Sequence, residues 1–588
     1  MKRIPLLIAL GIFSLIAAVI FIYDFKLENK KSAWDLIGQQ AVLVYKPTAS
    51  VNESIRETIE DAARDFLLLK DSSEKRNVIQ LLTENENALI SLNVIAKDDF
   101  DFTFYIPLLS EQDKKRVSTI QNAIVSGKST QRQRTFEGTV IYEIVSSTKN
   151  ILAFAIVEDI LIVSTTPFLV EDAVRISLID NPLTFKKSHP ELFQLSTVDK
   201  DDGNLYINLP EFFRWTKSFA DRNTSGEELF FGKSLLTDFK IEDQTAIFNG
   251  FAIDSTENEK SFLSLFNKQQ PVEFEMKSII STNTAAVLHY GISQPEDWYL
   301  DRDKFFKKNK IAIEDSLEKL SLYNFNAREF YKAIDNEVGL CLINSRKSTN
   351  SIFIVELRNI TSGLNSLRKL SATLATKNTD SIYSESYSDY EIGKIDLHNF
   401  GYNLFWPLGN KSSETYFTQS DDFILFSESD ELLKEFLNNI DEENTWGKSL
   451  RWNTFLQSTL QESNVDLFFD TNLLSSFFNE RLNSQWKSYF DSAHFFDIER
   501  GAVQFSKLEK DYYFAGNFPL TKPKTATVKP AAFTNLKFSH DLTSKPFLVR
   551  NHDTGNAELI VQDTLNTIFL VGSNGKVDWR LSLDEKIA

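Results

Sequence analysis

Two pairs of carboxylates precede two similar apolar stretches of the chain. Glu158-Asp159 comes before Ile160–Ser164, and Asp421-Asp422 comes before Phe423–Ser427. Neighbouring carboxylates can share the acid and base roles of a hydrolase. Both pairs also stand where a hairpin turn between two strands is expected. We interpret them as turn residues, and a carboxylate-based hydrolase is the weaker alternative.

A third acidic cluster, Asp199–Gly203, has the composition of a calcium-binding loop. Such a loop needs a bidentate Glu at its twelfth position, and Pro210 stands there instead. We therefore expect a solvated turn that leads into a strand at Leu205–Ile207.

The histidines and the cysteine show no arrangement typical of a metal or nucleophile site. The six histidines are spread singly, without a pair at metal-ligand spacing: His189, His289, His398, His494, His540 and His552. Cys341 is the sole cysteine and lies in an apolar run, so we expect a buried small hydrophobe. The phosphate, dinucleotide, zinc-protease and serine-nucleophile motifs are absent. The sequence therefore predicts no catalytic residue, no metal site and no cofactor.

One aromatic cluster, Phe400–Trp406, allows two interpretations. It could line a face that binds a sugar or a lipid, or it could be a core or sheet-edge patch. The cluster has no full counterpart earlier in the chain, which makes it a candidate binding site.

Length and composition limit the class of protein. A chain of 588 residues with 42% hydrophobic and 25% charged residues is typical of a globular protein with two to four domains. The net charge of −18 argues against a nucleic-acid partner, since phosphate binding needs a basic surface. The 49 phenylalanines favour strand-rich cores.

The elements that position these residues occur twice, in the same order. Five segments of the first half match five of the second: Ala41–Tyr45 with Ala286–Tyr290 (shift 245), Phe102–Ile106 with Ile352–Glu356 (250), Ile160–Ser164 with Phe423–Ser427 (263), Leu205–Asn208 with Leu467–Asp470 (262), and Phe248–Phe251 with Phe514–Asn517 (266). At these shifts His289 replaces Val44, and we expect a partly buried, hydrogen-bonded histidine. The pattern predicts an α+β fold, with two tandem copies of a largely antiparallel sheet covered by helices on one face, at residues 26–265 and 266–518.

The N-terminal segment, residues 1–25, is predicted to be a membrane anchor. Pro5–Tyr23 is uncharged and apolar, and as a helix it would be about 28 Å long, close to the thickness of a bilayer. A cleavable signal peptide is the alternative, although its apolar core is usually shorter. Lys2 and Arg3 precede the run, so we expect a single-pass protein of the inner membrane with the rest of the chain in the periplasm.

The C-terminal residues differ from the rest of the chain in composition and in the spacing of their apolar residues. Residues 519–545 carry three prolines among Lys, Thr and Ala, which is typical of a linker. Residues 546–588 show strand patterns with Asn574-Gly575 as a hairpin signal. With the pattern strand, Asp, strand, Asn-Gly-Lys, x-x-Trp, this piece resembles one blade of a quinoprotein-type or WD40-like β-propeller. One blade is incomplete, so the chain is either truncated or packs this segment as an extra sheet.

The order of these parts resembles a known family. The apolar N-terminus leads into Ala33–Ile37 and Ala41–Tyr45, followed by the duplicated body and the blade-like piece. This is similar to a family of uncharacterised membrane-anchored envelope proteins of Gram-negative type bacteria, and the resemblance implies location and architecture but no activity. We expect a non-enzymatic envelope protein that binds or scaffolds a partner through its periplasmic body. A lipid- or glycan-binding module is the alternative.

Overall fold

The computed structural model describes residues 31–520 and 537–586, apart from internal gaps at 49–86, 98, 116, 119–129, 146–150, 198–200, 220–229, 255–260, 310–319, 345–350, 407, 409–411, 484–485, 488–497, 544, 552–556 and 573–575. The chain divides into two compact units, residues 1–520 and 521–588. Each unit is described by itself.

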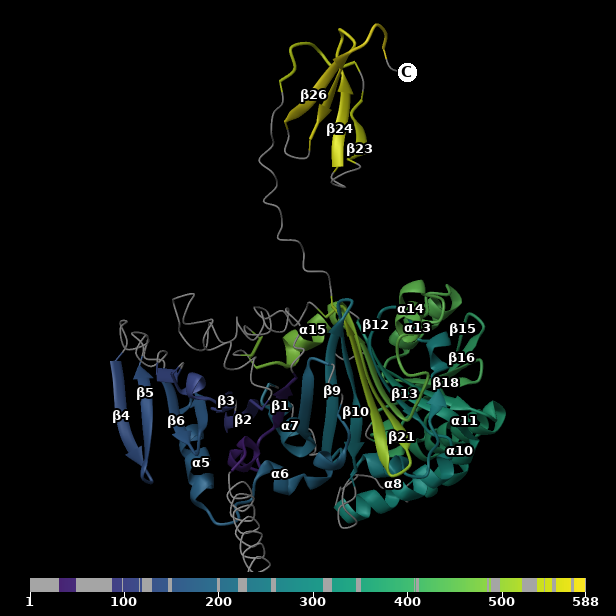
Figure 1. Ribbon diagram of the computed structural model, residues 1–588. Helices are drawn as coiled ribbons and strands as arrows, with labels where there is room; N and C mark the ends of the chain where they lie inside the picture. The colour runs from purple at the N-terminus through teal and green to yellow at the C-terminus, as the bar shows by residue number, and fades with distance from the viewer. Residues whose placement is uncertain are drawn as a thin grey trace, which may run out of the picture. The chain divides into compact units, whose positions relative to one another are not determined.

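The first half of the larger unit contributes ten strands to one antiparallel sheet (Figure 1). They are β1 (Leu43–Pro47), β2 (Leu89–Ala96), β3 (Asp99–Pro107), β4 (Thr130–Phe136), β5 (Thr139–Val145), β6 (Ile151–Val157), β7 (Ile160–Ser164), β8 (Gly203–Asn208), β9 (Ser234–Glu242) and β10 (Thr245–Ile253). Their pairings give the spatial order β4-β5-β6-β7-β3-β2-β1-β8-β9-β10.

The second half contributes ten more strands in the same arrangement. They are β12 (Thr284–Gly291), β13 (Ile334–Ile343), β14 (Ser351–Leu357), β15 (Ser384–Tyr387), β16 (Tyr390–Ile395), β17 (Thr415–Ser420), β18 (Phe423–Ser427), β20 (Val465–Asp470), β21 (Arg500–Leu508) and β22 (Asp511–Pro519). Their order is β15-β16-β17-β18-β14-β13-β12-β20-β21-β22. Position by position, the two halves therefore share one topology. The short strands β11 (Val272–Glu273) and β19 (Glu462–Ser463) form a separate pair.

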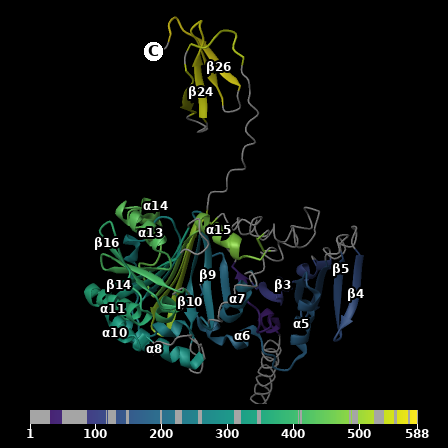
Figure 2. The ribbon, with the colours of Figure 1, turned by 180° about the vertical axis from the view of Figure 1, so that it is seen from behind.

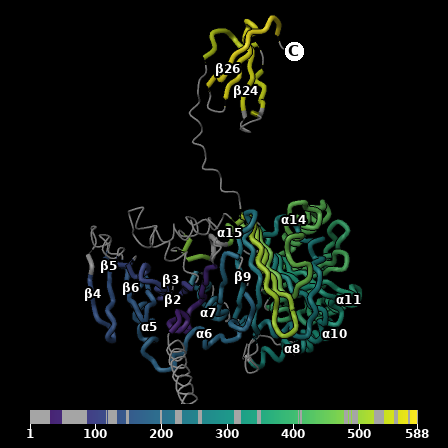
Figure 3. The backbone as a smooth tube through the Cα atoms, viewed as in Figure 1, coloured from purple at the N-terminus to yellow at the C-terminus, as the bar shows by residue number. Residues whose placement is uncertain are grey.

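The two halves are joined by β10 and β22, which pair with each other in antiparallel register. Asn249 pairs with Ala515, its own counterpart at the shift of 266. We call this junction the seam; Figures 1 and 3 show the yellow-green β21–β22 hairpin next to the β9–β10 hairpin, and β22 is the strand that pairs with β10. The expected fold class is wrong on this point, because the strands form one continuous 20-stranded sheet rather than two separate sheets. Strand periodicity does not reveal which open edges pair with each other.

The strand pairings also correct two of the predicted shifts. Tyr105 pairs with Ile162, and Ile354 pairs with Leu425, so Tyr105 corresponds to Ile354 at a shift of 249. Similarly, Lys46 pairs with Asn204, whereas His289 pairs with Asp466. Since Asn204 and Asp466 are equivalent at the shift of 262, His289 takes the place of Lys46 and not of Val44.

Helices cover both faces of the sheet in the second half, which corrects the expectation of one covered face. One core contains buried side chains of α8 (Pro295–Asn309), α10 (Ala327–Ala333), α11 (Ile360–Asn378) and α12 (Phe400–Phe405). A second core contains those of α13 (Asp430–Asp441) and α14 (Leu450–Leu456). Figure 2 shows α13 and α14 apart from α8, α10 and α11.

Helix α13 shows why the local sequence folds as it does. The Ser429 side chain accepts a hydrogen bond from the Leu432 N–H and caps the helix start. The apolar residues spaced along one side of α13 are buried: Leu432, Leu433, Phe436 and Leu437. Helix α5 (Pro167–Leu178) buries the equivalent stripe in the first half. The remaining helical segments are η1 (Ala33–Leu36), α6 (Phe185–Ser188), η2 (Pro190–Gln194), α7 (Leu209–Lys217), η3 (Leu263–Phe266), η4 (Met276–Ser278) and α15 (Thr471–Arg481).

None of the helices in the described part of the chain is long and apolar enough to cross a membrane. This finding contradicts the transmembrane element of the expected fold class, together with the signal anchor and the inner-membrane location that depended on it. The run that suggested the anchor, residues 5–23, lies outside the described residues. We therefore withdraw the prediction of a single-pass membrane protein.

The smaller unit forms a four-stranded antiparallel sheet in sequential order. Its strands are β23 (Phe547–Arg550), β24 (Ala557–Gln562), β25 (Thr567–Val571) and β26 (Val577–Ser582). Phe547, Ile560, Leu570 and Trp579 pair in one row across the four strands. The predicted hairpin residues Asn574-Gly575 lie outside the described residues. The resemblance to a propeller blade stays a prediction.

Candidate functional site

Both carboxylate pairs lie at hairpin turns, as the turn interpretation expected. Glu158 and Asp159 adopt positive φ angles of 48° and 65° between β6 and β7, and Asp421 adopts 50° between β17 and β18. In the first pair each acid faces a lysine: Lys31 Nζ lies 3.7 Å from Glu158, and Lys114 Nζ lies 3.2 Å from Asp159. Geometry and charge pairing both favour a structural role for these acids.

The acidic cluster of the suspected calcium loop is not solvated. Asp199 lies outside the described residues, but Asp201 and Asp202 are both buried. The Asp202 carboxylate accepts a hydrogen bond from the Ile241 N–H at 2.7 Å. Burial and the nearby Asp238 carboxylate raise the pKa of Asp201 to about 7. The expected solvated turn is therefore wrong, and the acids belong to the interior.

The aromatic cluster Phe400–Trp406 belongs to the core. Phe400, Leu404, Phe405 and Trp406 are buried in helix α12 and directly after it. The fully buried Arg302 guanidinium donates to the backbone oxygen of Leu404. The core interpretation is confirmed for these four side chains.

His289 lies in a group that we call the buried triad, formed by His289, Glu337 and Asp466. Its Nδ1 is 2.6 Å from an Asp466 carboxylate oxygen, and its Nε2 is 3.1 Å from Glu337. All three side chains are at most 1% exposed. Burial alone would lower the pKa of His289, but the two carboxylates raise it to about 9.

Further hydrogen bonds connect the buried triad to the chain around it. Glu337 accepts the backbone N–H groups of Glu275 and Met276, both at 2.9 Å. Ser463 and Gln504 donate to Asp466. The triad therefore fixes the segment that leads into η4, which is a structural task.

The remaining expectations about metals and thiols concern Cys341 and the scattered histidines. Cys341 is fully buried on β13, and burial raises the pKa of its thiol. Within the residues that the structure describes, no group of three or more His, Cys, Asp or Glu side chains could hold a metal ion. His494 and His552 lie outside the described residues.

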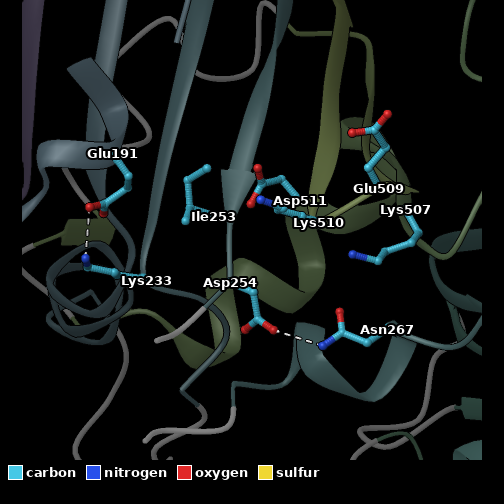
Figure 4. Close-up of a pocket in the computed structure, with 9 residues that line it drawn as sticks. All are labelled: Glu191, Lys233, Ile253, Asp254, Asn267, Lys507, Glu509, Lys510 and Asp511. Atoms are coloured by element: carbon cyan, nitrogen blue, oxygen red, sulfur yellow. Dashed lines mark hydrogen bonds and ion pairs between the residues drawn. The ribbon is translucent and has the colours of Figure 1, made fainter. Parts of the chain in front are cut away.

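The charged cavity that we take as the candidate site lies at the seam (Figure 4). This seam pocket has a volume of about 540 Å³. Its first wall comes from the first half, with Glu191 on η2, Lys233 before β9, and Ile253 and Asp254 at the end of β10. Its second wall comes from the second half, where the β21–β22 hairpin provides Lys507, Glu509, Lys510 and Asp511.

On one side of the seam pocket, charged side chains already have ion-pair or hydrogen-bond partners within the protein. Glu191 pairs with Lys233 at 2.9 Å and accepts a hydrogen bond from Ser234 at 2.9 Å. Burial alone would raise the pKa of Glu191, but its polar contacts with His189, Lys233 and Ser234 lower it to about 2. Asp254 accepts a hydrogen bond from Asn267 at 3.2 Å. These contacts hold the Glu191 and Asp254 carboxylates in place on this wall.

The other side carries four charged side chains, of which Glu509 and Lys510 are exposed and Lys507 and Asp511 are partly buried. Lys507 extends its amine toward the space between Asp254 and Asp511 (Figure 4), and the amine lies 4.6 Å from the centre of the Tyr512 ring. Among the described residues, neither the Lys507 amine nor the Asp511 carboxylate has an ion-pair partner within 4.0 Å. Burial lowers the pKa of Lys507 and raises that of Asp511.

This arrangement can bind a small polar ligand that carries both charges. Lys507 would contact an anionic group, and Asp511 would contact a cationic one. The sequence did not point to this pocket, because its residues come from segments far apart in the chain. Asp466, a partner of His289, left a better signal, since it stands between Val465 and Leu467 in β20.

No protein-family model and no curated protein matches the chain. Among solved structures, the chain is similar to crystal form III of TP0453, with a TM-score of 0.24 and 12% sequence identity, over 40% of this chain and 83% of that chain. A likeness of this size carries no argument about fold or function.

Proposed function

We propose that this protein is a non-enzymatic binding protein, and that the seam pocket is its ligand site. The observation that carries the proposal is the pair Lys507 and Asp511, which line the pocket, are partly buried and have no ion-pair partner within 4.0 Å among the described residues. Desolvated charges without partners are costly, so a ligand that supplies both opposite charges gains from both contacts. The ligand class is a small zwitterion, such as a short peptide with free ends.

The position of the pocket supports the same proposal. Its two walls belong to the two halves of the sheet, and pairing of β10 with β22 holds them in place. A site on rigid strands needs little rearrangement to bind, which limits the entropic cost of association. Lys507 and Asp511 flank the turn of the same hairpin, so their backbones are held at a constant separation by strand pairing.

The test is calorimetric titration of the full chain with triglycine and its end-blocked forms. We expect zwitterionic triglycine to bind at least tenfold more tightly than N-acetyl-triglycine, triglycine amide or the doubly blocked peptide. Lys507→Gln and Asp511→Asn should each remove this preference. The matched control is Lys240→Gln, an exposed lysine of β9 outside the pocket.

Two outcomes contradict the proposal. Equal affinity for the free and the doubly blocked peptide would exclude a zwitterion site. Mass spectrometry of the recovered peptide tests the absence of catalysis, and cleavage of triglycine that depends on Lys507 would show an enzyme instead.

A further inference from the structure

A second cavity lies in the first half, away from the seam, and has a volume of about 380 Å³. Its walls are largely apolar, with Trp34, Leu89, Leu108 and Leu109 among them, and Lys46 provides a cation. We call it the first-half pocket. The size and the mixture of apolar walls with a few charged side chains are typical of small-molecule sites.

The repeat shows why Lys46 is unusual. Its counterpart in the second half is His289, a cation held between Asp466 and Glu337. The position of Asp466 is taken in the first half by Asn204, which pairs with Lys46 across the strands. The first half thus keeps the cation but replaces this anion by a neutral amide.

The second anion of the triad is also replaced. Val44 pairs with Ser91 and Val287 pairs with Cys341, so these strands match at a shift of 250. At this shift Asn87 takes the place of Glu337, and Asn87 lines the first-half pocket. Both internal counter-charges of the second half are therefore missing at their equivalent positions in the first half.

The carboxylates at the rim of the pocket do not compensate Lys46. Glu158 faces Lys31 at 3.7 Å, and Asp159 faces Lys114 at 3.2 Å. Among the described residues, Lys46 has no carboxylate within 4.0 Å and no side-chain hydrogen bond. The Lys46 amine is therefore the charged group of this pocket that remains available to a ligand.

We propose that the first-half pocket binds an amphipathic carboxylate, with the carboxylate at Lys46 and the apolar body against Trp34, Leu89 and Leu108. The ligand supplies the anion that Asp466 supplies in the second half. Burial of the apolar body adds the hydrophobic part of the affinity. This site is separate from the seam pocket and does not depend on the function proposed for it.

Calorimetric titration of the full chain with decanoate, decan-1-ol and acetate tests the proposal. We expect decanoate to bind at least tenfold more tightly than decanol, which lacks the charge, and than acetate, which lacks the apolar body. Lys46→Gln should lower decanoate affinity at least tenfold and leave decanol affinity unchanged. Asn204→Asp gives Lys46 an internal anion in a side chain of the same size, so it should weaken decanoate binding as well.

Two further variants keep the test decisive. Leu109→Asp places an acid on the wall at a side chain that is 69% exposed, so the fold tolerates it, and it should also weaken decanoate binding. Lys507→Gln disables the seam pocket and should leave decanoate binding intact. Equal binding of decanoate and decanol, wild-type affinity in both Lys46→Gln and Leu109→Asp, or loss of decanoate binding in Lys507→Gln would each overturn the proposal.

Discussion

Lys46 and His289 occupy equivalent places in the two halves of the sheet, but their surroundings differ. His289 is fully buried between two carboxylates, whereas Lys46 pairs with Asn204 across the strands and lines a cavity together with Asn87. The same strand order forms in both halves, with the acids around His289 and with the asparagines at the equivalent positions near Lys46. The backbone topology therefore does not require the buried triad. The comparison teaches that a duplicated fold can keep a cation at one position while neutral side chains replace the acids around it.

Removal of one acid from the buried triad should have the largest effect. We expect Asp466→Ala to lower the free energy of unfolding by about 3–5 kcal/mol, because it leaves a buried imidazolium without its closest anion. The matched change Asn204→Ala in the first half should cost only about 1 kcal/mol, since it removes a neutral group. Urea denaturation of both variants measures the difference. Equal losses in the free energy of unfolding would show that Asp466 and Asn204 stabilise the fold equally, and would contradict this prediction.

The pH dependence of stability should also reveal the triad. The folded pKa of His289, about 9, lies above its ordinary value of 6.5. Its contribution is therefore fully present below pH 6.5 and is lost as the pH rises from 6.5 to 9, by up to about 3 kcal/mol. Unfolding free energies measured across this range check the prediction.

The control for this pH effect is a variant with a neutral triad of nearly the same size, His289→Gln with Glu337→Gln and Asp466→Asn. Glu337 is replaced in this control because burial raises its pKa as well. Burial, together with the charge of Glu337, also raises the pKa of the adjacent Glu356, to about 7. The difference between wild type and control should fall with pH. A flat difference would mean that His289 is neutral in the folded protein.

The two equivalent glycines at the seam allow a comparison of packing. A Cβ atom at Gly250 would meet the Leu236 carbonyl and lie 2.6 Å from the Thr237 Cα, both in the backbone of β9. A Cβ atom at Gly516 would meet the Phe518 and Phe248 side chains, which can shift. We expect Gly250→Ala to cost about 2–3 kcal/mol and Gly516→Ala about 1 kcal/mol. Thermal unfolding of both variants tests this order, and the reverse order would contradict the register of the seam.

The smallest effect concerns a buried acid of the first half. Ser463 takes the place of Asp201 in the second half, and the folded pKa of Asp201 is raised from 3.8 to about 7. Above pH 7 its charge therefore costs stability, and below pH 3.8 the cost disappears. Asp201→Asn should stabilise the protein by about 1–2 kcal/mol at pH 8 and very little at pH 4. Destabilisation at pH 8 would mean that the carboxylate is bound by a favourable partner.

The sequence predicted much of the local structure. Apolar periodicity located the strands at Ile160–Ser164 and Phe423–Ser427 and the buried stripe of α13, because burial of one face follows directly from residue spacing. It also showed that the segments repeat in order. Two shifts were wrong by one and two residues, because apolar strands match one another about equally well in neighbouring registers.

Only the tertiary structure decided how these elements work together. The pairing of β10 with β22 made one sheet of the two halves, and it brought Glu191 and Asp511 to the same pocket. Strand pairing across the sheet also placed His289 beside Asp466 and Lys46 beside Asn204. Local sequence determines which face of a strand is buried, but hydrogen bonds between distant strands determine which side chains meet. For this protein, therefore, the sequence by itself determined the repeating elements, and the long-range register determined its two candidate sites.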